Sequence, residues 1–249
     1  TPDEHGAFSF LVRSRTDFDV KHIVNATFLR GSTLWDLLGS AGTTVGVYNV
    51  PMTYPVQPVN GFLVSGLMTP STRSVFTFPE QLTGDLLSRF PEYTLDVGWM
   101  RYRGRPVELV DELIAMTRQR VEAFRFLTER HDADFWMCVF ISPDRIQHAL
   151  WKYLDPSHPS HDAREAAEVI PHVRRYFREL DMAVGDVISM MGNDSDILVM
   201  SDHGFHANAR QVLLNEWLAR EGFLRWRSPT RRWVQQRLHA GKRFARKQV

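Results

Sequence analysis

Short apolar runs alternate with amphipathic stretches along most of the chain. Thr44–Val50 and Phe135–Ile141 are nearly continuous runs of apolar and β-branched residues, which are typical of strands buried on both faces. Asp196–Met200 predicts a further short strand, and Phe62–Ser65 predicts another. Buried strands separated by helices indicate a parallel sheet that is covered by helices on both sides. The pattern therefore predicts an α/β fold with three layers, α/β/α, and a largely parallel sheet.

Helical spacing of apolar residues, together with capping residues, predicts the segments between the strands. The predicted helices are Leu34–Ala41, Pro79–Arg89, Pro106–His131, residues 161–191 and Gln211–Glu221. Thr33 caps the first of these, and Gly222 ends the last. Residues 161–191 form either one long helix or two helices broken near Pro171. Residues 1–32 predict irregular structure with strand-like pieces at Ala7–Val12 and Ile23–Ala26.

The composition excludes several kinds of protein and site. The chain has 249 residues, of which 43% are hydrophobic and 24% charged, as in ordinary globular proteins. Its single cysteine, Cys138, excludes an internal disulfide and a zinc site built from several thiolates. No apolar run reaches the ~20 residues of a membrane helix. The chain starts at Thr1 without a methionine or a signal peptide, so we expect a cytoplasmic protein whose natural start lies upstream.

The charges are distributed unevenly. Residues 225–249 contain nine Lys or Arg and no Asp or Glu, although the net charge of the whole chain is only +1. We therefore predict an acidic domain over residues 1–224 and a basic, partly helical appendage over 225–249. Tryptophans interleave with the arginines of the appendage, which suits nucleic acid or an anionic membrane, but a solvated or inter-domain helix is the favoured interpretation.

An Asp and a His follow each of two predicted strands. Asp144 and His148 come after Phe135–Ile141, and Asp202 and His203 come after Asp196–Met200. Ligands gather at the carboxyl ends of parallel strands, and carboxylate with imidazole suits zinc or manganese. The spacing of four lets Asp144 and His148 converge on a helix, whereas neighbouring Asp202 and His203 are expected to point apart. A helix N-cap or a hydrogen-bonded core histidine is the structural alternative.

The same segments resemble a known family. Ser201-Asp202-His203-Gly204-Phe205 resembles the metal motif of the type I phosphodiesterases/nucleotide pyrophosphatases, in the alkaline phosphatase superfamily. Pro143–His148 resembles the other metal segment of that family, and Asn49–Pro55 resembles a stretch that precedes it in a prokaryotic branch. The resemblance covers about residues 5–226.

The resemblance implies an alkaline-phosphatase-like fold and hydrolysis of a small-molecule phosphodiester or nucleotide pyrophosphate by two divalent ions, zinc or manganese. By position, Asp144 and His148 would bind the first ion, and Asp202 and His203 the second. The family's nucleophilic Thr or Ser would lie upstream of Thr1, and its last metal-binding His would lie downstream. We therefore expect an internal fragment, truncated at both ends, with an incomplete fold and no activity.

Other functions are also compatible with the sequence. A phosphomonoesterase or a phosphoglycerate-mutase-like enzyme belongs to the same superfamily, and a non-catalytic protein that binds anions or nucleic acid belongs to another class. The proline-rich loop at residues 51–61 follows a strand, so we expect it to face the substrate, with Tyr54 and Asn60 contacting the leaving group.

Overall fold

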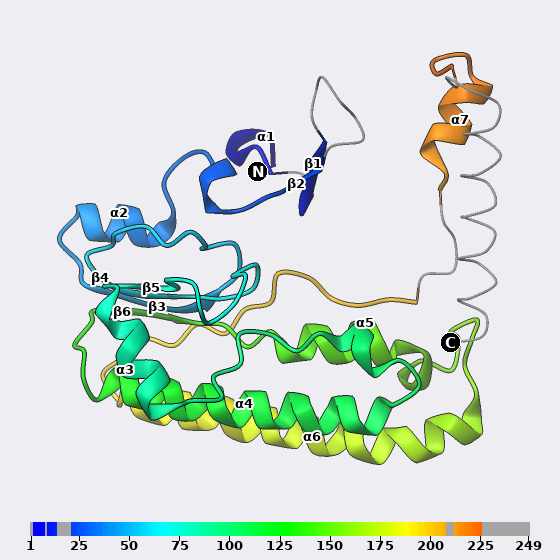
Figure 1. The fold of residues 1–249 in the computed structure, drawn as a ribbon. Helices are drawn as coiled ribbons and strands as arrows, with labels where there is room; N and C mark the ends of the chain where they lie inside the picture. The colour runs from blue at the N-terminus through cyan, green and yellow to red at the C-terminus, as the bar shows by residue number, and fades with distance from the viewer. Residues whose placement is uncertain (1, 8, 14–20, 208–211, 226–249) are drawn as a thin grey trace. The chain divides into compact units, whose positions relative to one another are not determined.

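A computed structural model describes residues 2–7, 9–13, 21–207 and 212–225 (Figure 1). The chain divides into two compact units. The first consists of residues 1–98, 112–144 and 177–197, and the second of residues 99–111, 145–176 and 198–249. The predicted basic appendage lies almost entirely outside the described residues, so its boundary stays a prediction.

The first unit contains a four-stranded sheet in the order β5-β4-β3-β6. Its central strand β3 (Val45–Val50) is buried along its whole length, as its apolar sequence predicts. It pairs in parallel with β4 (Gly61–Ser65) and with β6 (Phe135–Cys138). Only β5 (Thr77–Phe78) runs antiparallel, beside β4. The predicted, largely parallel sheet is confirmed.

Five helices begin and end close to the predicted positions: α2 (Leu34–Ser40), α3 (Gln81–Arg89), α4 (Pro106–Thr128), α6 (Ala163–Met191) and α7 (Leu214–Arg220). A further helix, α5 (Ser142–Leu154), is not among the predicted helices. Thr33 caps α2 in a capping box: its hydroxyl accepts from the Asp36 N–H, and the Asp36 carboxylate accepts from the Thr33 N–H. Since α6 continues through Pro171, one long helix is the correct alternative of the two that the sequence left open.

Short elements complete the description. They are α1 (Pro2–His5), β1 (Leu11–Arg13), β2 (Lys21–Ile23) and two 3₁₀ helices, η1 (Ala26–Phe28) and η2 (Trp99–Tyr102). The strands β1 and β2 pair antiparallel in a separate two-stranded sheet, close to where the sequence predicted strand-like pieces. Among the described helices, none is long and apolar enough to cross a membrane.

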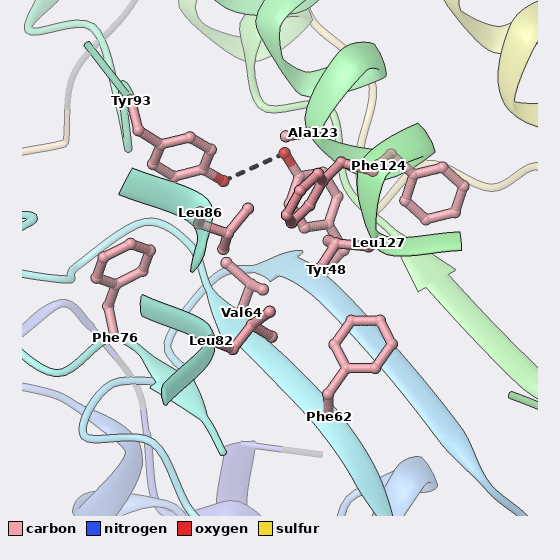
Figure 2. Close-up of a cluster of buried hydrophobic side chains, with 11 residues drawn as sticks. Tyr48, Phe62, Val64, Phe76, Leu82, Leu86, Tyr93, Ala123, Phe124 and Leu127 are labelled. Atoms are coloured by element: carbon pink, nitrogen blue, oxygen red, sulfur yellow. Dashed lines mark hydrogen bonds between the residues drawn. The ribbon is translucent and has the colours of Figure 1, made fainter. Parts of the chain in front are cut away.

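Two hydrophobic clusters lie on opposite faces of the sheet of the first unit. One cluster joins the sheet to α3 and α4 and comprises Tyr48, Phe62, Val64, Phe76, Leu82, Leu86, Tyr93, Ala123, Phe124, Phe126 and Leu127 (Figure 2). The other contains Val45, Val47, Val50 and Leu63, with Trp35 and Leu38 of α2 packed against it. Because successive strand residues point to opposite faces, Val47 and Tyr48 enter different clusters. The unit therefore has the three layers α/β/α that the sequence predicts.

One predicted strand is wrong. Residues 196–200 belong to no strand, and Leu198 and Met200 are 83% and 74% exposed. An apolar run forms a strand only when its backbone N–H and C=O groups bond to a neighbouring strand. The sequence of the run does not show whether such a neighbour is present. The predicted strand Phe135–Ile141 is also shorter than expected. It ends at Cys138, because the pair formed by Cys138 and Tyr48 is the last one between β6 and β3.

Candidate metal centre

Helix α5 carries the first predicted ligand pair. Asp144 lies in its first turn, where the helix dipole favours a carboxylate, and His148 follows one turn later on the same face. The first residue of α5, Ser142, is fully buried, and its hydroxyl lies 2.8 Å from Thr117 Oγ1 of α4. This hydroxyl pair fixes where α5 begins and thereby where Asp144 lies.

Aromatic rings surround His148 in the second unit. The Trp99 ring is nearly parallel to the imidazole, with the centroids 6.3 Å apart and 10° between the planes. Phe205 meets the same imidazole edge-on at a centroid distance of 4.9 Å and stacks on Trp151 at 5.8 Å. The centroids of His203 and Phe205 are 5.1 Å apart. Phe205 thus contacts both of the histidines that the sequence predicts as metal ligands.

The second predicted pair lies on exposed chain. Asp202 Oδ2 is 3.5 Å from His203 Nε2, so these neighbouring side chains face each other and do not point apart as expected. The reason is local: no strand holds this segment in an extended conformation that would place the two side chains on opposite sides. The Ser201 hydroxyl donates to the His203 carbonyl oxygen at 2.8 Å, which makes the segment a compact turn.

The four predicted ligands are only partly brought together. His148 and His203 share Phe205 as a neighbour, and Asp202 lies beside His203. Within the described ranges, no three residues of the types His, Cys, Asp and Glu are grouped so that they could hold a metal ion. Metal ligation by these residues stays a prediction.

The two predicted substrate-binding residues lie on the loop between β3 and β4. Asn60 Nδ2 donates to the Thr43 carbonyl oxygen at 2.9 Å, so Asn60 joins the beginnings of β3 and β4. Tyr54 is half-buried, and its carbonyl oxygen accepts from the Ala26 N–H at 2.8 Å. The structure gives both residues a bridging role within the fold, and substrate contact stays a prediction for each.

A buried polar group that the sequence analysis did not identify lies near the carboxyl end of β3. Arg120 and Asn49 are 1% and 2% exposed, and the phenol of Tyr93 lies beside them. A signal for Arg120 exists in the sequence. Positions 113, 116, 120, 124 and 127 follow helical spacing, and all except 120 are apolar, so an arginine occupies the buried stripe of α4.

Comparison with known proteins adds the family. The model of one family, "Type I phosphodiesterase / nucleotide pyrophosphatase", matches residues 1–248. Comparisons with curated proteins and with solved structures give no significant match. The family match includes both Asp-His segments and agrees with the resemblance that the motifs indicate. On this match, which spans nearly the whole sequence, the chain belongs to the type I phosphodiesterase/nucleotide pyrophosphatase family of hydrolases.

Proposed function

We propose that the protein hydrolyses a small-molecule phosphodiester or nucleotide pyrophosphate with two divalent ions, zinc or manganese. Asp144 and His148 would hold one ion, and Asp202 and His203 the other. The observation that supports this proposal most is the common contact of the His148 and His203 rings with Phe205 in a chain of this family. Two imidazoles from distant parts of the sequence are thereby held near one another.

The donor chemistry of these residues fits such ions. Each pair offers one carboxylate and one imidazole, and these ligands suit zinc and manganese. The only thiol, Cys138, is not a candidate, since burial raises its pKa to about 12 and a neutral thiol is a poor ligand. A bound divalent ion would neutralise charge on the phosphoryl oxygens.

The surroundings of the histidines explain how the chain would orient its ligands. Trp99 and Phe205 contact the His148 ring from two directions, so rotation of the imidazole is restricted by packing. Asp202 has an exposed side chain beside His203 and can turn toward an ion without breaking a buried contact. Ligands held by packed neighbours lose less conformational entropy when they bind.

Calorimetry with zinc or manganese on the 249-residue chain tests the proposal. Replacement of His148 by Ala, or of Asp202 and His203 together by Asn and Ala, should each lower the affinity at least tenfold. Replacement of His172 on α6 by Ala is the matched control and should leave the affinity unchanged. Because an imidazole must be neutral to bind a metal ion, acid should also weaken binding. Equal affinity in all four proteins would overturn the assignment.

A further inference from the structure

Arg120 of α4 places a positive charge in the interior of the first unit. Its Nη2 donates to the Leu95 carbonyl oxygen at 2.7 Å and lies 3.6 Å from the Met116 sulfur. Its Nε and Nη1 are buried without a hydrogen-bond partner, and no described carboxylate pairs with the guanidinium. A buried charge without a counter-ion is strongly unfavourable, so this arginine requires an additional partner.

Asn49, at the carboxyl end of β3, also carries a buried N–H donor that lacks a hydrogen-bond partner. The pairing of β3 with β4 shifts register between Tyr48 and Val50, so Asn49 is the residue that falls out of the ladder. Its φ of 59° is unusual for a residue other than glycine. Residue 66, which lies against the Asn49 backbone, is a glycine. Any other residue there would place its Cβ 2.2 Å from the Asn49 carbonyl oxygen, so the glycine makes room for this backbone conformation. Asn49 Oδ1 accepts from the Tyr93 hydroxyl at 3.1 Å, but Nδ2 is buried with no partner.

Tyr93 links the two side chains. Its hydroxyl is shared between Asn49 Oδ1 and the Tyr48 hydroxyl oxygen, the latter at 3.2 Å (Figure 2). Tyr93 also lies two residues before Leu95, whose carbonyl oxygen accepts from Arg120. The Arg120 charge lowers the pKa of both tyrosines, against the larger effect of burial. Asn49 and Arg120 therefore surround one buried polar region.

The unpartnered atoms define the chemistry of the missing group. All three, Asn49 Nδ2 and Arg120 Nε and Nη1, are N–H donors, so the group must be an acceptor. Burial raises the pKa of Tyr48, Tyr93 and Cys138, so none of these supplies a negative charge at neutral pH. We propose that Arg120 and Asn49 form a buried site for an oxyanion, a carboxylate or a phosphate group. The planar guanidinium matches the oxygen geometry of both.

The place of this site in the fold suits a ligand. Asn49 lies at the carboxyl end of a central parallel strand, the edge at which ligands of α/β sheets bind. Strained backbone that is held by its surroundings also concentrates at ligand sites. Neither Arg120 nor Asn49 is among the metal ligands proposed above, so either proposal can fail without the other.

Thermal unfolding in a chelator, at constant ionic strength, tests the site on the 249-residue chain. Inorganic phosphate and acetate serve as probes and chloride as the reference. Phosphate or acetate should raise the unfolding temperature in a saturable way, whereas chloride should not. Calorimetry with the effective anion should give one site per chain. A larger rise in the unfolding temperature with phosphate than with acetate indicates a phosphate site, and the reverse indicates a carboxylate site.

Three variants make the test specific. Arg120→Met should abolish the anion response, while Arg118→Met, which removes an exposed arginine of the same helix, should keep it. Asn49→Asp keeps the acceptor for Tyr93 and adds a carboxylate beside Arg120, so it should weaken anion binding at least tenfold even if Arg120→Met fails to fold. Equal responses to phosphate, acetate and chloride, or a full response in Asn49→Asp, would overturn the proposal.

Discussion

The hydroxyl oxygens of Thr117 and Ser142 lie 2.8 Å apart, and both side chains are buried. Thr117 also donates to the Leu113 carbonyl oxygen within its own helix, at 2.7 Å. The pair therefore ties the middle of α4 to the first residue of α5, two positions before Asp144. Because the Thr117 hydrogen is used in that bond, the Ser142 hydroxyl donates to Thr117, and a candidate metal ligand is positioned by a hydrogen bond to a neighbouring helix.

Replacement of Thr117 by Val should lower the free energy of unfolding by about 1 kcal/mol, because it removes a hydroxyl partner of a buried serine and adds only a methyl group. Urea unfolding measures this loss. The matched control is Thr128→Val, since the Thr128 hydroxyl bonds only to the Arg125 carbonyl oxygen of its own helix. An equal effect of the two substitutions would contradict the role given to the pair.

Asp134 connects the beginnings of two parallel strands and makes stability depend on pH. Its Oδ2 accepts from the Thr44 hydroxyl at 2.6 Å and from the Thr44 N–H at 2.9 Å, and these bonds hold the pKa of Asp134 below its usual value. A lowered pKa in the folded state means that stability is present above about pH 4 and is lost as the pH falls through the lowered pKa. Asp134→Asn should therefore flatten the acid side of the stability curve in denaturant titrations, whereas Asp132→Asn should not.

Phe205 should influence metal binding without being a ligand. Phe205→Ala removes the ring that contacts both His148 and His203, so both imidazoles gain freedom that binding must then remove. We expect a loss of zinc affinity of about tenfold or more, as for other residues that orient ligands. Phe223→Ala, at a side chain that is 79% exposed, is the control in the same calorimetric titration. An unchanged affinity would show that the shared ring has no part in the site.

The core of the first unit should depend strongly on α3. Leu86 is fully buried in the cluster of Figure 2, so Leu86→Ala should cost about 2–5 kcal/mol of unfolding free energy. Leu198→Ala, at an 83% exposed position, should change it by less than about 0.5 kcal/mol. Thermal and urea unfolding compare the two variants directly.

Much of the fold follows from local sequence signals. The β-branched run of β3 predicts a strand because a strand that is buried on both faces is apolar at nearly every position. The apolar stripe of α4 predicts a helix because a helix that is buried on one side repeats apolar residues every three to four positions. Thr33 and Asp36 likewise predict the start of α2, since a capping box needs only residues three apart. These signals depend on neighbours along the chain.

The candidate site depends more on neighbours in space. The motif at Asp202 and His203 predicted the residues, but the sequence contained no sign that Phe205 contacts His148. The apolar run before the motif predicted a strand, and the described chain provides no strand beside it. Arg120 is recognisable by its position in an apolar stripe, but its nearness to Tyr48 of β3 comes from the packing of α4 on the sheet.

The unpaired run Ile197–Met200 also affects how the protein behaves at high concentration. These are four consecutive exposed apolar residues, and two of them, Ile197 and Val199, are β-branched, so the run favours intermolecular β-pairing. Asp194 and Asp196 precede the run and Asp202 follows it, so three carboxylates repel an approaching copy of the same segment. Loss of these carboxylates would remove the repulsion, and the protein should then aggregate at a lower concentration.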